Sequence, residues 1–324
     1  MILSKAFGTT SFFVSLIWAL SMGVCASCNS ASNHEKGPKK KFEQTSFFLD
    51  SLRQLEPKTE NSLLLEEKKE EARINFLEDS TDLNTIIWYG RRLAYLNHFE
   101  EAISIFSRGI TVHPNAPELY RHRGHRMISL RRFEEAILDL NHAAKLAQNR
   151  PVEIEPDGLP NKLAIPLSNL HYNIYYHLGL AYYLLADYTN AVKSFQSCIA
   201  YSNNDDLKAA TTYCLVLADL RLGRNNDVEK LLSLIHPNME IIENQAYLEQ
   251  LLIFKNQSTS DYPKDSSGPK ETNPTSLYGI SVWYEHRGDT GSASNIRKRM
   301  LSTGSWTYFG YIAAEADSLR RLID

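Results

Sequence analysis

Apolar residues recur in the middle of the chain at the spacing of amphipathic helices. Over residues 83–146 the same apolar and polar pattern occurs twice, and its two copies are thirty-four positions apart. The matching pairs are Gly90 and Gly124, Phe99 and Phe133, and Ala102 and Ala136. Each copy predicts two helices joined by a short turn. An internal repeat of this length indicates a solenoid of helix pairs, in which each pair packs only on its neighbours.

Small and aromatic residues are placed where the two helices of the first copy would meet. Residues 96–98 form the predicted turn. Gly90 and Ala102 fall where the helices would cross, and small side chains let two backbones approach closely. Phe106 fills the remaining space, and Pro114 ends the second helix because proline cannot continue it.

These positions resemble the tetratricopeptide repeat, whose small, aromatic and terminal proline residues correspond to Gly90, Phe99, Ala102, Phe106 and Pro114. Two consecutive copies in register make the resemblance specific. It implies an all-α fold, a right-handed solenoid of helical hairpins with capping helices at its N-terminal end. It also implies that the protein works by binding. The alternative is an unrelated pair of helical hairpins.

The predicted solenoid extends, with interruptions, over residues 83–322. A segment rich in proline and glycine, residues 151–171, is an insertion between the second and third repeats. A polar linker covers residues 256–274. Before the first repeat, residues 42–80 predict capping helices that cover its exposed apolar side. Repeats are expected near residues 83–116, 117–150, 172–205, 209–237 and 274–301, followed by a closing helix over 306–322.

The first part of the chain predicts a targeting signal. An apolar stretch covers residues 12–20, and the small residues Ala26 and Ser27 precede Cys28. This order resembles a bacterial lipoprotein signal peptide, residues 1–27, after which Cys28 would carry a lipid anchor with palmitate among its acyl chains. Residues 28–41 then form a polar tether. We expect a bacterial cell-envelope protein, lipid-anchored at the outer membrane or on the periplasmic face. A plain secretory signal cut near Ala26 is the alternative.

The overall composition limits the kinds of partner. The chain has 324 residues, of which 43% are hydrophobic and 23% charged, and its formal net charge is −3. These values are ordinary for a globular protein, and nucleic-acid binding would need a basic excess, so no nucleic acid is expected. Cys198 and Cys214 lie on predicted helical faces and are expected to be small core residues, with a disulfide between them as the alternative.

The inner helices of the predicted solenoid carry aromatic and basic residues. In tetratricopeptide repeats the first helix of each unit lines the concave side. The resemblance therefore places ten side chains in one groove: Trp88, Arg91, Tyr95, Arg121, His122, His125, Asn173, Tyr176, His177 and Tyr213. Aromatic rings and arginines anchor peptides, and arginine fits carboxylates, so we expect a protein or peptide partner with an acidic segment. The alternative is that the rings pack between helices while the basic side chains are solvated.

One subclass of the family grips a carboxyl-terminal carboxylate with two basic residues and two asparagines at fixed positions. The corresponding residues here are Ile87, Arg91, His122, Asn173 and His177. Only Arg91 fits that pattern, so the resemblance does not extend to carboxyl-terminal clamping.

The insertion offers a second hypothesis about the groove. Its acidic residues Glu153, Glu155 and Asp157 follow a repeat that bears several arginines. The insertion would then fold over the basic groove and compete with an acidic ligand. A solvated surface loop is the simpler alternative.

Catalysis finds little support in the sequence. His122 and His125 lie three positions apart, but a helix this rich in arginine is a poor cation site, so no metal and no cofactor are expected. The sequence has no glycine-rich phosphate loop and no nucleophile elbow. We therefore predict a membrane-tethered scaffold rather than an enzyme, with a protein or peptide partner in its concave groove. A glycan- or nutrient-capturing surface lipoprotein is the alternative.

Overall fold

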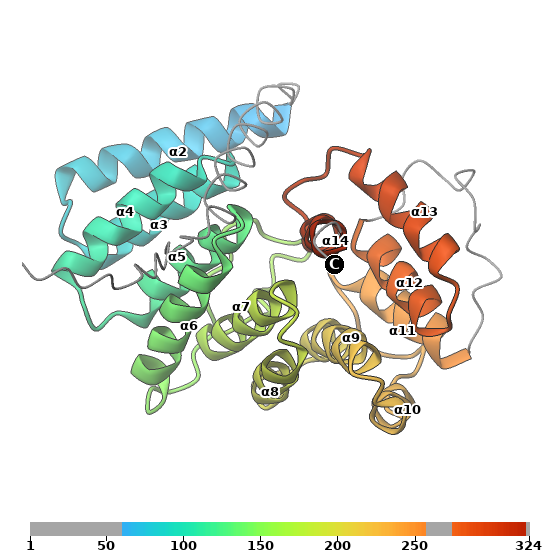
Figure 1. Cartoon of the computed structure of the whole chain (residues 1–324). Coiled ribbons are helices and arrows are strands. Elements are labelled where there is room, and N and C mark those ends of the chain that lie inside the picture. The colour runs from blue at the N-terminus through green and yellow to red at the C-terminus, as the bar shows by residue number, and fades with distance from the viewer. Residues whose placement is uncertain (1–59, 257–273, 322–324) are drawn as a thin grey trace, which may run out of the picture.

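The computed structural model describes residues 60–256 and 274–321, and Figure 1 shows them as an arc of helices. The predicted signal peptide, Cys28, the tether, the first part of the capping segment and residues 257–273 of the linker lie outside the described residues. Within the two described ranges, no helix combines the length and the apolar character that crossing a membrane requires.

The described chain is all-α. Its helices are α2 (Glu60–Glu78), α3 (Leu83–Tyr95), α4 (Phe99–Val112), α5 (Pro117–Ser129), α6 (Phe133–Ala147), α7 (Leu170–Leu184), α8 (Tyr188–Ile199), α9 (Asp205–Arg221), α10 (Asn225–Ser233), α11 (Gln245–Asn256), α12 (Pro274–His286), α13 (Thr290–Leu301) and α14 (Phe309–Arg320). The extended pairing found in these residues is one isolated bridge between Ile154 and Asn169. Helix α2 packs on α3 and so caps the first hairpin.

Ten of these helices form five hairpins, α3–α4, α5–α6, α7–α8, α9–α10 and α12–α13, whose turns share one geometry. A residue with a left-handed φ between 61° and 83° follows each first helix: Asn97, Arg131, Ala186, Gly223 and Gly288. The next N–H then donates to the carbonyl five positions earlier, as from His98 to Leu93 at 3.0 Å. This is the Schellman arrangement, which satisfies carbonyls at the end of a helix. The same turn therefore recurs in all five hairpins.

Close helix crossing explains the glycine of each early repeat. A Cβ on Gly90 would lie 2.4 Å from the ring of Phe106, and a Cβ on Gly179 would lie 2.4 Å from the ring of Phe195. Both phenylalanines are almost fully buried. The expectation that a small residue permits this approach is therefore confirmed.

Two elements differ from the pattern in the sequence. The pattern predicts the fourth repeat from residue 209, but α9 begins at Asp205, because the side chain of Asn204 caps it by accepting from the N–H of Leu207 at 2.9 Å. The pattern also predicts a closing helix from residue 306, but α14 begins at Phe309. Trp306 instead lies in the preceding turn, where it is buried.

The last helix folds back into the hollow of the arc. Figure 1 shows α14 end on, between α5 and α12. Arg131, at the turn of the second hairpin, pairs with Glu315 at 2.7 Å and donates to the carbonyl of Trp306 at 3.1 Å. The indole of Trp306 packs edge-on against Phe99, with ring centroids 5.7 Å apart. The concave side is therefore partly filled by the chain itself.

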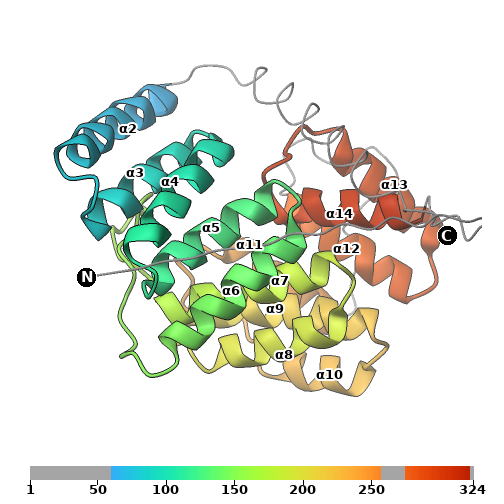
Figure 2. The same cartoon turned by 60° about the vertical axis from the view of Figure 1, so that its left-hand side comes forward.

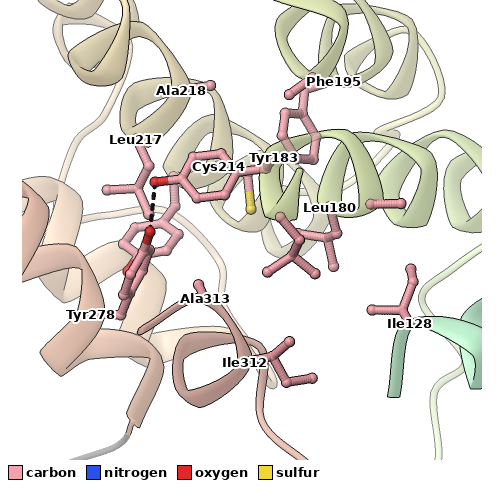
Figure 3. Packing of buried hydrophobic residues seen from close by; sticks show 14 of the residues in the cluster. Ile128, Leu180, Tyr183, Phe195, Cys214, Leu217, Ala218, Tyr278, Ile312 and Ala313 are labelled. Carbon is pink, nitrogen blue, oxygen red and sulfur yellow. Dashed lines mark hydrogen bonds between the residues drawn. The ribbon is translucent and has the colours of Figure 1, made fainter. Parts of the chain in front are cut away.

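The hydrophobic core continues from α14 into the neighbouring hairpins. In Figure 3, Ile312 and Ala313 of α14 lie below Leu180, and Ile128 lies to the right. All four belong to the main hydrophobic cluster. Tyr278 donates a hydrogen bond to Tyr183 at 3.1 Å, which joins α12 to α7.

The two cysteines expected in the core are buried and free. Burial raises the pKa of the Cys214 thiol to about 12, so it stays protonated at neutral pH. The prediction that both cysteines are small core residues is confirmed, and the alternative of a disulfide between them is wrong.

Candidate functional site

A cavity of about 380 Å³ opens on the inner side of the first three hairpins. Helices α3, α5, α7 and α9 form its walls, together with the insertion and the start of α11. Eight of the ten predicted groove residues line it: Arg91, Tyr95, Arg121, His122, His125, Asn173, Tyr176 and His177. Their role as ligand-binding residues stays a prediction, but the structure brings them together.

The other two predicted groove residues lie elsewhere. Trp88 lines a separate hollow between α2 and α3, where Arg91 and Arg92 stack over its indole at 4.5 and 5.0 Å. Tyr213 is fully buried and donates to the carbonyl of Thr275 at 2.6 Å. Helix α12 covers this part of α9, so the prediction that Tyr213 faces the groove is wrong.

The insertion between α6 and α7, residues 148–169, is largely exposed, but the stretch around Glu155 lines the cavity. Figure 2 shows the insertion rising from the end of α6 toward α3. The carboxylate of Glu155 lies 3.2 Å from Arg121 and 3.3 Å from His122. Asn173 donates to the same carboxylate at 2.6 Å, and the Glu155 side chain is only 11% exposed. The alternative of a solvated loop is therefore wrong for Glu155, whereas Glu153 is exposed.

Backbone contacts hold the same stretch of the insertion. Arg91 Nη2 donates to the carbonyl of Pro156 at 2.8 Å, and Arg92 Nη1 donates to the carbonyl of Gly158 at 2.9 Å. A Cβ on Gly158 would lie 1.9 Å from the hydroxyl of Tyr95, so only glycine fits this position without displacing the ring.

The far wall of the cavity is positioned by one buried carboxylate. Asp206, at the start of α9, accepts the N–H groups of Ile242, Glu243 and Asn244 at 2.7 to 2.8 Å. These bonds place Glu243 and Asn244 beside the insertion, and Glu243 accepts from Asn161 at 2.7 Å. The aromatic ring of Tyr247 continues the wall one helical turn later.

The hydrogen-bond partners of two cavity histidines show which ring nitrogen of each carries the proton. Arg121 can only donate, so Nδ1 of His122 accepts from it at 2.7 Å, and Nε2–H of His122 faces Glu155. Nδ1 of His177 donates to the carbonyl of Asn173 at 2.6 Å. Burial and then the charge of Arg121 lower the pKa of each ring to about 3, so both are neutral at pH 7.

His125 packs on His177 with ring centroids 3.9 Å apart. Burial, followed by the charge of Arg126, places the pKa of His125 well below its usual range. Metal binding by these rings has no support in the geometry, since no group of three potential ligands with metal spacing occurs in residues 60–256 or 274–321.

Three arginines and three carboxylates line the cavity, and one of these arginines, Arg126, has no carboxylate partner among the described residues. Burial raises the pKa of Glu155, but the charge of Arg121 and the contact with His122 outweigh it and hold the pKa well below its usual range. Arg126 stacks over Phe99 at 5.4 Å and has no ion pair with a carboxylate in the described part of the chain. Burial and the neighbouring Arg121 lower its pKa to about 9, which still leaves it charged at pH 7. Arg126 can therefore pair with a further carboxylate.

The sequence pattern missed Tyr247, which lines the cavity, and Arg92, which holds the insertion from outside it. Tyr247 belongs to α11, which lies outside the five hairpins, so no repeat position pointed to it. Arg92 follows Arg91 on α3 and reaches the insertion from the adjacent face, a contact that depends on the path of the loop.

Residues 172–205, which form α7 and α8, match the family model of the tetratricopeptide repeat. The chain carries a tetratricopeptide repeat. The human protein named Tetratricopeptide repeat protein 13 is 27% identical over 138 residues, which are 40% of this chain and 13% of that protein.

Solved tetratricopeptide structures resemble the fold only loosely. YrrB, described as a TPR protein with an unusual peptide-binding site, is 13% identical and aligns over 77% of this chain and 99% of its own, with a TM-score of 0.42. A tetratricopeptide repeat protein from Parabacteroides merdae is 16% identical and aligns over 87% of this chain and 98% of its own, with a TM-score of 0.47. The assignment of a tetratricopeptide-like all-α solenoid rests on the helical hairpins and their shared turn.

Proposed function

We propose that the protein is a membrane-tethered scaffold of the bacterial cell envelope, which binds a protein or peptide partner in its concave cavity. Solenoids of this type present a concave surface for binding, and tetratricopeptide repeats are protein-interaction scaffolds. One observation supports this role more than any other. Side chains from three successive hairpins and the insertion converge on the same 380 Å³ cavity.

The arginines of the cavity favour an acidic segment as the ligand. Arg91, Arg121 and Arg126 line it together with Glu155, Asp157 and Glu243. Glu155 pairs with Arg121, whereas Arg126 has no ion pair with a carboxylate in the described part of the chain. Arginine binds carboxylates through two parallel hydrogen bonds, and a cavity sheltered from water strengthens that attraction. Aromatic walls at Tyr95 and Tyr176 suit the apolar stem of an acidic side chain.

The proposed tether rests on the order of residues before Cys28. A lipid chain on Cys28, followed by a polar segment, would hold the helical part near a membrane without inserting it. A Cys28→Ser variant expressed in a bacterial host is expected to leave the membrane fraction and appear in the soluble fraction. Equal distribution of the two proteins would contradict the anchor.

Site-specific crosslinking in intact cells tests the binding role. A photoreactive residue at His125 would face the cavity, and the same residue at Leu138, which is 72% exposed on α6, is the matched control. We expect mass spectrometry to find one envelope protein trapped at position 125 and absent at position 138. Capture should fall in an Arg126→Gln background. The same proteins at both positions, or capture unaffected by Arg126→Gln, would refute a specific groove.

A further inference from the structure

Part of the insertion occupies the cavity in the way a bound peptide would. Residues 151–158 form neither helix nor strand, apart from the bridge at Ile154, and they place a carboxylate and two carbonyls against side chains of α3, α5 and α7. The carboxylate of Glu155 reaches Arg121, His122 and Asn173, and the carbonyls reach Arg91 and Arg92. Side chains predicted to bind a ligand are thus already bound, by the chain itself.

We infer that the insertion is an internal ligand, and that the partner's binding segment has the chemistry of Glu155-Pro156-Asp157-Gly158. This inference rests on the proposed function and adds the ligand class and its regulation. The segment is a short extended peptide with a carboxylate at its first position and glycine at its fourth. It binds when the insertion leaves the cavity, so the insertion limits access to the site.

The geometry explains three of the four positions of the segment. The first position needs a carboxylate because two hydrogen-bond donors and a buried arginine surround it. The second uses only its carbonyl, which proline also possesses, to accept from Arg91. The fourth favours glycine, because a Cβ there would displace the side chain of Tyr95.

The insertion is held in a way that allows it to leave. Five of its large apolar side chains are exposed and contribute little to the core: Val152, Ile154, Leu159, Leu163 and Ile165. Its attachment depends mainly on the polar contacts of Glu155, Pro156, Gly158 and Asn161. A segment with few buried apolar contacts opens at a lower free energy than a packed helix. Opening therefore does not require the hairpins to unfold.

A partner segment can also make a contact that the insertion does not make. Arg126 lines the same cavity and has no carboxylate partner in residues 60–256 or 274–321. A second acidic side chain in the partner can pair with it. This contact gives the partner an advantage over the internal ligand, whose local concentration is roughly millimolar because it is part of the chain.

A synthetic peptide tests the inference with a known probe. The peptide PVEIEPDGLPN, residues 151–161, is labelled and titrated by fluorescence anisotropy against the native chain and against a variant whose residues 152–158 are replaced by a Gly/Ser linker of equal length. We expect the peptide to bind the linker variant at least tenfold more tightly, as removal of a competing internal ligand requires. Equal affinity for both proteins, or no binding to the linker variant, would overturn the inference.

Two altered peptides provide the matched control. Glu155→Gln in the peptide removes the charge that faces Arg121 and should weaken binding at least tenfold, whereas Glu153→Gln changes an exposed carboxylate and should leave binding unchanged. Equal effects of the two changes would refute the proposed register. Should the linker variant not fold, the full chain with Glu155→Gln takes its place, with the same expected direction.

The inference and the proposed function can fail separately. If the protein trapped at position 125 binds the native chain and the linker variant equally, the internal ligand is refuted and the scaffold remains. If the peptide binds the linker variant but no protein is trapped in cells, the cavity chemistry stands and the scaffold role is refuted.

Discussion

Acid should destabilise this protein well before its carboxylates are protonated, because the cavity buries neutral histidines. His122 and His177 have pKa values of about 3 in the folded chain, whereas histidine in an unfolded chain has a pKa of about 6.5. Between these values the unfolded state binds more protons than the folded state. The free energy of unfolding therefore falls as the pH falls through 6.5, and it keeps falling toward pH 3.

The size of this effect follows from the two pKa values. Each pKa unit corresponds to about 1.4 kcal/mol, so each ring should remove about 2 kcal/mol of stability between pH 7 and pH 5. The two rings together should remove about 4 kcal/mol, which is a large share of a typical domain's stability of about 5–15 kcal/mol. Glu155 changes the free energy of unfolding little between pH 7 and pH 5. Its pKa is depressed in the folded chain, so the stability that it contributes is lost only as the pH falls below about 4.5.

Urea unfolding at pH 7 and pH 5 measures the difference directly. A His177→Gln variant should lose about 2 kcal/mol less than the native chain over this interval, since one proton-binding group is removed. His236→Gln is the control, because His236 is exposed and lies outside the cavity. A native chain whose unfolding free energy is the same at both pH values would refute the assignment of neutral, buried histidines. An unchanged difference in His177→Gln would refute it for that ring.

Two further predictions concern the fold. Gly179→Ala places a Cβ 2.4 Å from the ring of Phe195 and should cost about 1–3 kcal/mol in urea unfolding. Gly223→Ala has no neighbour within 4 Å but a φ of 68°, so it should cost only about 1 kcal/mol; equal losses would refute tight crossing at Gly179. Arg131→Ala removes the ion pair with Glu315 and should cost about 3 kcal/mol, with faster proteolysis within α14; unchanged proteolysis would show that this contact does not hold the helix.

The hairpins could be predicted from the sequence because their signals are local. The thirty-four-residue period places Asn97 and Arg131 at the same point of successive turns, and both have a left-handed φ. Gly90 and Phe106 likewise meet where the pattern requires a small residue beside a large one. Such features depend on spacing within one unit, which a sequence displays directly.

The closure of the arc could not be predicted in this way. Arg131 and Glu315 are 184 positions apart, and no periodicity relates them. Tyr213 has the spacing of a groove residue, but α12 covers it, and that packing arises only when the last hairpin is in place. The charges of the insertion and of the groove suggested that Glu155 contacts the groove. The burial of its carboxylate could not be predicted, because it depends on the path of the loop.

The most direct test of a carboxylate-binding cavity is the affinity of the residue 151–161 peptide for the linker variant, with and without Arg121→Ala. Arg150→Ala is the charge-matched control, since Arg150 is exposed and pairs with Glu118 away from the cavity. Loss of one partner from a buried charge pair typically costs about 2–5 kcal/mol, so Arg121→Ala should weaken binding by at least about thirtyfold. Arg150→Ala should leave it unchanged. Equal affinities for the Arg121→Ala and Arg150→Ala proteins would contradict recognition of an acidic segment in this cavity.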